Sequence, residues 1–275
     1  MKKLYFGTAG VPISAKRDDS KEGVRRISEL GLDAMELEFV QGVRLSLEGA
    51  EAIDELRKKL DVKLTAHGPY YINLNAVEPH KVIASRNHIL SAARVGWRAG
   101  AVGVVFHAAF YLKQPADKVY RRVKKELKGL VKSLRAEDNE ILLRPETTGK
   151  GSQFGTLQEL IKMSEDVPGV MPCLDFSHMH ARQNGGLGFE DFKTMLSDLE
   201  AALGRTSLDN IHIHLSGIEY TEKGERRHTT LEDSDFLYED VLKALKEFDV
   251  KGIVICESPI LEDDAIVLKE FYEGL

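Results

Sequence analysis

Residues 171–180 read MPCLDFSHMH, an apolar run that ends in Asp175 and is followed three residues later by His178. The pattern predicts a buried strand whose carboxylate emerges where the strand ends, with an imidazole at the start of the next segment. Such a pair can bind a metal ion, but an Asp that caps a helix beside a solvated His would give the same sequence. The same construction recurs along the chain, and this recurrence favours the metal site.

Short apolar runs alternate with amphipathic segments along the whole chain. The expected strands are 4–6, 34–39, 62–66, 102–106, 141–145, the run ending at 175, 211–214 and 253–256. The clearest helix between them has apolar residues at helical spacing over 119–134. Apolar strands that alternate with helices indicate a parallel sheet covered by helices. Eight such units favour a single-domain (β/α)8 TIM barrel over residues 1–275, and the runner-up is an open, doubly wound sheet.

The composition excludes several kinds of protein. No apolar run approaches the length of a membrane span, and the first residues lack a signal-peptide pattern, so we expect a cytoplasmic protein. Cys173 and Cys256 both fall in predicted strands, which argues against a disulfide framework or a zinc–thiolate cluster. The net charge of −6 argues against binding nucleic acid through bulk charge, but it leaves room for a local basic patch.

Six consecutive predicted strands end in a side chain that can bind metal. These side chains are His67, His107, Glu146, Asp175, His214 and Glu257. In a TIM barrel the C-terminal ends of all strands surround one mouth, so residues far apart in the sequence meet there. Three imidazoles and three carboxylates exceed what one ion needs if positions stay open for water and substrate. We therefore expect two ions, with Glu146 as the bridging carboxylate.

The donor set also predicts the metal and the reaction. Imidazole and carboxylate together suit zinc, with Mn²⁺ or Fe²⁺ as alternatives, whereas calcium and magnesium prefer oxygen alone. Two ions roughly 3.5–4 Å apart can clamp the attacking and leaving oxygens of an in-line phosphoryl displacement. Phosphoester hydrolysis is therefore the leading prediction.

Several motifs, taken together and in order, resemble the endonuclease IV family of apurinic/apyrimidinic endonucleases, within the xylose isomerase-like TIM barrel superfamily. The motifs are HGPYYINL at 67–74, FH at 106–107, PETTGKGS at 145–152, CLDFSH at 173–178, HL at 214–215, RH at 227–228 and CE at 256–257. The resemblance runs from the third predicted strand to the end of the chain. It implies a trinuclear zinc centre that cleaves the phosphodiester on the 5′ side of an abasic nucleotide.

The resemblance also assigns roles to individual residues. The implied ligands are His67, His107 and Glu146 for the first ion, Glu146, Asp175, His214 and Glu257 for the second, and His178 and His228 for the third. Tyr70 matches an aromatic residue that the family inserts into DNA at the lesion. Glu146 and Glu257 are also our catalytic candidates.

One position departs from the family pattern. The family completes its third ion with an Asp two residues before the second His of that site, where this chain has Arg226. Either Glu225 reaches the site through a one-residue shift, or the third site is weakened or empty. We predict that Arg226 then supplies the missing positive charge and contacts a substrate phosphate, which makes it a further catalytic candidate.

Basic residues are frequent in the loops expected to surround the mouth. They are Lys16, Arg17, Arg44, Lys113, Lys150, Arg182, Lys223, Arg226 and Arg227. A basic mouth on an acidic protein would suit a polyanion. Loops that are simply exposed to solvent are also polar, so the same residues could have no binding role. We expect a monomer that binds double-stranded DNA containing abasic sites, without membrane association, and Arg44 and Lys150 join Tyr70 as DNA-contact candidates.

Two other functions remain open. In a sugar isomerase or epimerase of the same superfamily, Glu146, Asp175, His214 and Glu257 would hold one Mn²⁺ or Mg²⁺ ion, with Glu146 and Glu257 moving protons next to a carbonyl. A non-catalytic relative could keep metal for stability alone. His212, on the same face of its strand as His214, is expected to support that ligand from behind or to fill the barrel.

Overall fold

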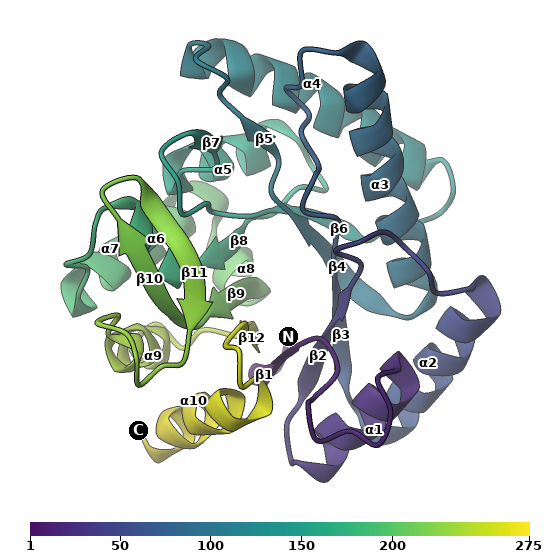
Figure 1. Cartoon of the computed structure of the whole chain (residues 1–275), viewed down its shortest axis with the longest axis vertical. Coiled ribbons are helices and arrows are strands. Elements are labelled where there is room, and N and C mark those ends of the chain that lie inside the picture. The colour runs from purple at the N-terminus through teal and green to yellow at the C-terminus, as the bar shows by residue number, and fades with distance from the viewer.

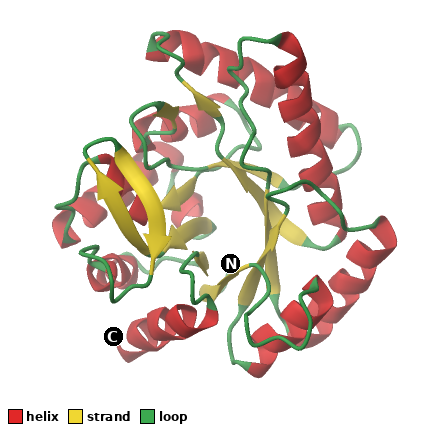
Figure 2. Ribbon diagram, viewed as in Figure 1, coloured by secondary structure: helices red, strands yellow, loops and turns green.

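Eight parallel strands form the wall of a barrel in the computed structural model, which describes residues 1–275 (Figure 1). The barrel strands are β1 (Leu4–Ala9), β2 (Ala34–Glu38), β3 (Lys63–His67), β4 (Ala101–Phe106), β6 (Leu142–Pro145), β8 (Cys173–Asp175), β9 (Ile211–Leu215) and β12 (Gly252–Cys256). Helices surround this wall as an outer ring (Figure 2). The main helices are α1 (Ser20–Glu29), α2 (Leu47–Leu60), α3 (Pro79–Arg98), α4 (Ala116–Arg135), α5 (Leu157–Asp166), α7 (Phe189–Leu203), α9 (Tyr238–Glu247) and α10 (Glu262–Gly274).

The strand order β6-β4-β3-β2-β1-β12-β9-β8 leaves β6 and β8 at the two ends of the sheet. These ends meet through isolated parallel bridges, Leu143 with Val170 and Glu146 with Cys173. The backbone N–H of Thr147 also donates to the carbonyl of Cys173 (3.1 Å). The sheet therefore closes on itself, which confirms the (β/α)8 TIM barrel and rules out the open doubly wound sheet.

Helical periodicity explains how the outer ring packs. Along α4, the residues Val119, Val123, Leu127, Leu130 and Leu134 are all at most 3% exposed, as their spacing predicts. They belong to a core of 62 buried residues. This layer fixes the strands, and thereby the side chains at their ends.

The inside of the barrel contains a second, smaller packed region of mixed chemistry. Tyr5, Ala34, Ile253 and Ile255 form an apolar cluster there. Elsewhere inside, the buried residues are polar or reactive: Glu36, Arg144, Cys173 and His212. Each of these four residues lies two positions before a residue of the mouth: Glu38, Glu146, Asp175 and His214. Side chains alternate along a strand, so each inner residue faces inward like the mouth residue that follows it.

Some elements were not anticipated from the sequence. They are β5 (Ala109–Phe110), β7 (Gln153–Phe154), α6 (Phe176–Arg182), α8 (Arg205–Leu208), β10 (Gly217–Thr221) and β11 (Gly224–Thr229). β10 and β11 form an antiparallel hairpin that packs against α6 (Figure 1). No helix has the length and apolar character needed to cross a bilayer.

Candidate metal centre

The first donor set joins the ends of β3, β4 and β6. His67 Nδ1 donates to the carbonyl of Gly68 (2.7 Å), which turns Nε2 toward Glu146. His67 Nε2 and His107 Nε2 lie 3.3 Å and 3.0 Å from Glu146 Oε2. Both ring nitrogens therefore approach the same carboxylate oxygen, as predicted for the first ion, while the donor atoms that all lie within 4.8 Å of one another here are those of His107, Glu146 and His178.

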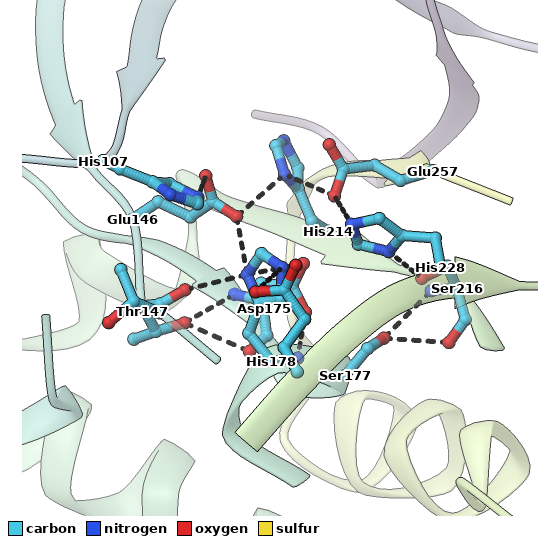
Figure 3. A network of polar contacts seen from close by, with 12 residues as sticks. His107, Glu146, Thr147, Asp175, Ser177, His178, His214, Ser216, His228 and Glu257 are labelled. Carbon is cyan, nitrogen blue, oxygen red and sulfur yellow. Dashed lines mark hydrogen bonds and ion pairs between the residues drawn. The ribbon is translucent and has the colours of Figure 1, made fainter. Parts of the chain in front are cut away.

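The second set joins β6, β8, β9 and β12. Its members Glu146, Asp175, His214 and Glu257 have donor atoms within 4.8 Å of one another. His214 Nδ1 lies 3.5 Å from Glu146 Oε1 and 3.3 Å from Glu257 Oε2 (Figure 3). Asp175 has two roles, because Oδ1 accepts a hydrogen bond from the backbone N–H of His178 at the start of α6 (2.6 Å), while Oδ2 has no hydrogen-bond partner. Helix capping and the ligand position are therefore compatible.

The third set consists of His178, Glu225 and His228, whose donor atoms also lie within 4.8 Å of one another. His178 Nδ1 contacts the carbonyl of Thr147 (3.1 Å), and its Nε2 lies 3.5 Å from Glu225 Oε2. His228 Nδ1 is hydrogen-bonded to Ser216 Oγ (2.6 Å), which leaves Nε2 free for an ion when Nδ1 is the donor (Figure 3). All eight metal ligands predicted from the sequence are thus brought together at the mouth, with Glu225 in addition.

A β-bulge explains why Glu225, and not Arg226, completes this set. Glu219 pairs with Arg227 across the hairpin, but the next residue, Tyr220, pairs with Glu225. Arg226 is the extra residue, so the alternation of β11 shifts and Glu225 shares a face with His228. Arg226 and Arg227 both form ion pairs with Glu219 on the outer face. Of the two outcomes open from the sequence, the one-residue shift is observed, and Arg226 is turned away from the ligands, contrary to its prediction as a catalytic residue.

The electrostatics of the site favour bound cations. Burial acts to raise the pKa of Glu146, but the charge of His107 and contacts with histidines hold it well below its usual range. Burial raises the pKa of Asp175 well above its usual range, and the charge of Glu257 adds to this effect. Burial opposes protonation of His67, yet contact with Glu146 and the charge of Glu38 raise its pKa to about 10. Protons here neutralise crowded carboxylates, a task that divalent cations perform at the same positions.

Orphaned polar atoms give an independent test of whether metal fits. Glu146 Oε1, Asp175 Oδ2, His178 Nε2, His214 Nδ1 and Glu257 Oε2 are all buried and lack hydrogen-bond partners. Buried polar atoms are normally paired, because desolvation without a partner costs about 1–3 kcal/mol. These atoms belong to the second and third donor sets, and imidazole and carboxylate are ligands that zinc accepts. The residues therefore fit divalent metal.

The mouth holds a pocket of about 500 Å³ above these ligands. Tyr70 lines it with 61% of its surface exposed, and its ring lies 5.6 Å from that of His67. Lys150 lines it as well, whereas Arg44 lies in an adjoining depression beside Glu38. Two of the three DNA-contact candidates therefore border the metal pocket itself.

The expected basic mouth is not what surrounds the ligands. Lys150 is the one Lys or Arg among the residues that line the pocket, and it faces Glu225 at 3.9 Å. Arg182 is turned inward and donates to the carbonyls of Thr148, Lys150 and Gln153. The mouth is less basic than predicted because several loop arginines are bound to backbone carbonyls or to neighbouring carboxylates.

Sequence reasoning missed two carboxylates on β2. Glu36 is buried with Oε1 3.0 Å from His214 Nε2, which identifies it as a support for that ligand. Glu38 lines the mouth pocket, where its Oε1 has no partner. The alternation Met35-Glu36-Leu37-Glu38 was the available signal, because in a closed barrel every second residue faces inward. His212 does lie behind His214, as expected, with Nε2 3.3 Å from Glu36 Oε2.

Comparisons with known proteins agree with this architecture. A protein of Methanocaldococcus jannaschii described as uncharacterized is 45% identical over 273 residues, which cover 99% of this chain and 98% of that protein. Endonuclease IV from Thermus thermophilus superposes with a TM-score of 0.76 at 20% identity, covering 99% of this chain and 100% of that one. A D-tagatose 3-epimerase-like protein gives a TM-score of 0.73 at 19% identity, with 97% and 96% coverage.

The two structural likenesses show the fold, and they include a nuclease and an epimerase-like protein alike. The family model that matches this chain covers residues 24–271 and is described as xylose isomerase-like TIM barrel. With that match across most of its length, the chain belongs to the xylose isomerase-like TIM barrel family.

Proposed function

We propose that this protein is a metal-dependent phosphodiesterase that incises DNA at abasic sites, in the manner of endonuclease IV. The observation that carries the proposal is the third donor set, His178, Glu225 and His228. A sugar isomerase or epimerase with one ion needs only the four residues around Asp175. Nothing in such a reaction requires two further sets of histidines at the same mouth.

The donor residues of this protein would bind the zinc ions for phosphodiester cleavage and set the positions of those ions. Zinc ions bound here would polarise the phosphoryl oxygens and stabilise the departing oxygen. Glu146 serves more than one set, since Oε2 contacts His67 and His107 while Oε1 contacts His178 and His214. It therefore fixes the spacing of the reacting groups, which is a large part of catalysis of this kind.

Substrate recognition is proposed to use the rim of the pocket. Tyr70 and Tyr71 are 61% and 56% exposed on the loop that follows β3. Exposed aromatic rings can stack on bases beside a gap in a duplex. Lys150 is placed to meet a phosphate once Glu225 is engaged by an ion. A monomer bound to one damaged duplex fits this arrangement.

A specific observation favours a second candidate, a one-ion sugar isomerase or epimerase. The pocket is lined by four carboxylates, Glu38, Glu146, Glu225 and Glu257, against a single lysine. Such a lining suits hydroxyl groups, which can donate to carboxylates, better than it suits phosphate. In that reaction Glu146 and Glu257 would move the proton next to the sugar carbonyl.

The experiment that separates the candidates combines a metal count with two assays. The zinc-loaded protein is given a duplex with one abasic site, the same duplex undamaged, and a panel of ketoses. We expect incision on the 5′ side of the abasic site, several ions per chain and no ketose turnover. Ketose turnover by a protein that holds one ion, without incision, would replace this proposal with the second candidate.

A matched pair of variants sharpens the distinction. Glu225→Gln should lower incision by about 10²-fold, as expected when one transition-state-stabilising group is lost. A one-ion sugar reaction should keep its ion and lose far less activity, because Glu225 is outside the four-residue set and the amide of Gln still accepts a hydrogen bond from a sugar hydroxyl. Glu219→Gln, on the partner strand of the hairpin and facing the two arginines, is the control and should leave incision unchanged.

A further inference from the structure

A second group of metal-binding side chains lies inside the barrel, one level below the mouth. Cys173, His212 and His214 have donor atoms within 4.8 Å of one another. Glu36 reaches them from β2, with Oε1 3.0 Å from His214 Nε2 and Oε2 3.3 Å from His212 Nε2. All four residues are at most 1% exposed, and none but His214 belongs to the donor sets of the mouth.

The contacts within this group are close but are not hydrogen bonds. Both oxygens of Glu36 and both ring nitrogens of His212 and His214 lack a hydrogen-bond partner, despite the short separations. Their lone pairs and N–H groups are therefore not aimed at each other. In a tetrahedral site with bonds of about 2.0–2.1 Å, neighbouring nitrogen and oxygen ligands lie about 3.3 Å apart. The two separations between Glu36 and the rings lie near this value, and the donor atom of Cys173 lies within 4.8 Å of those of both histidines.

We propose that Glu36, Cys173, His212 and the Nε2 atom of His214 form an inner metal site, distinct from the donor sets of the mouth. Four protein ligands would close the coordination sphere, which is the arrangement of structural rather than catalytic zinc. The set of one thiolate, two imidazoles and one carboxylate suits zinc well. His214 presents Nδ1 to the mouth and Nε2 to this site, so its ring links the two levels.

The charges balance when the protons are followed. Binding releases the thiol proton of Cys173 and the remaining ring proton of His214, which becomes an imidazolate. Glu36, the thiolate and the imidazolate then carry three negative charges, which the ion and the nearby guanidinium of Arg144 offset. Arg144 is 1% exposed and donates to the carbonyls of Pro172 (3.2 Å) and Asn210 (2.8 Å).

A competing occupant is a water molecule. Without an ion, the thiol keeps its proton, and water could bridge Glu36 to the two rings. The thiol distinguishes the two occupants, because only a metal ion turns it into a thiolate ligand. No cysteine belongs to the mouth sets, and the chain has just two cysteines.

Cobalt provides the test. The protein is loaded with Co²⁺ to saturation, its ions are counted, and its near-ultraviolet spectrum is recorded for thiolate-to-cobalt charge transfer. We expect this band in the unmodified protein. Cys173→Ser should lose the band and one ion per chain while it keeps the ions of the mouth. Cys256→Ser, which removes the other fully buried thiol, is the matched control and should keep both.

A cobalt-saturated protein without the band would overturn the inner site, and would point to water between Glu36 and the rings. Loss of the band in Cys256→Ser but not in Cys173→Ser would overturn it too. If Cys173→Ser does not fold, the spectra of the unmodified protein and of Cys256→Ser still decide. Incision is not part of this test, so the inner site and the proposed nuclease activity can fail separately.

Discussion

The barrel interior has two regions that are equally buried but opposite in chemistry. In one, Tyr5, Ile253 and Ile255 fill the space with apolar groups, and burying such a side chain stabilises a fold by about 1.5–3 kcal/mol. In the other, Glu36 and His212 are buried to the same degree with polar atoms left unpartnered, each at a cost of about 1–3 kcal/mol. The polar region destabilises the fold unless a ligand binds its unpartnered atoms. We therefore attribute the presence of these buried polar residues to function.

Removing the shared carboxylate should have the largest effect. Glu146→Gln should lower incision by about 10³-fold or more, because Glu146 contacts histidines of all three donor sets, whereas the loss of one stabilising group costs about 10²–10³-fold. Incision kinetics and metal content measure the change. Glu126→Gln is the control, since Glu126 is a buried carboxylate that pairs with Arg86 on the outer ring. Equal losses in both variants would mean that Glu146 matters for folding alone.

A substitution in the apolar region should lower the stability of the protein without changing the number of metal ions that it binds. Ile253→Ala should destabilise the protein by about 3 kcal/mol, from lost transfer energy and the cavity left behind. The ions per chain should stay the same, because Ile253 supplies no donor atom. Denaturant unfolding and metal analysis check the two halves of this prediction. A variant that folds normally but loses ions would show that the two regions are not separate.

The ionisation of Glu38 should make the stability of the metal-free protein depend on pH. Burial raises the pKa of Glu38 to about 8, and the charge of Glu36 adds to the effect of burial. Between its usual value of 4.5 and about 8, the folded metal-free chain keeps this proton while the unfolded chain loses it. Stability of the metal-free protein should therefore fall as pH rises through this window, by about 2 kcal/mol at the partly open mouth.

Glu38→Gln should flatten this dependence, because the amide does not ionise. Thermal unfolding of the metal-free protein at pH 5 and pH 8.5, with and without the substitution, makes the comparison. Identical slopes in the two proteins would assign the dependence to other groups.

The smallest effect is expected for Arg226→Ala. Its guanidinium pairs with Glu219 at the surface, where an ion pair contributes about 0–1 kcal/mol. Incision should change by no more than about twofold, and the third donor set should keep its ion. A large loss of incision with the ions retained would instead restore Arg226 as a substrate-contacting residue.

The sequence predicted the barrel because its signals were repetitive. Each strand was a short apolar run, and each of six runs ended in a donor, so closure of the sheet alone was enough to bring His67 and Glu257 to one mouth. Their positions could be predicted without knowing which side chains surround them. The regular spacing of strands and helices carried the prediction.

The residues that were missed or misplaced depend on local irregularities. Glu36 and Glu38 alternate with apolar residues, which also describes a strand with one wet face, so their inward direction follows only once the barrel is closed. Arg226 was misplaced because a bulge adds one residue without any compositional mark. The inner group was not predicted, because Cys173 looks like an ordinary strand residue and His212 was expected only to support His214 or to fill the barrel.

The central claim is that strand ends far apart in the sequence share divalent ions at one mouth. Anomalous diffraction at the zinc edge, from crystals of the zinc-loaded protein, tests it most directly. We expect strong peaks between His67, His107 and Glu146, between Asp175, His214 and Glu257, and between His178, Glu225 and His228. A well-ordered mouth that gives no anomalous peak beside Glu146 would contradict the account.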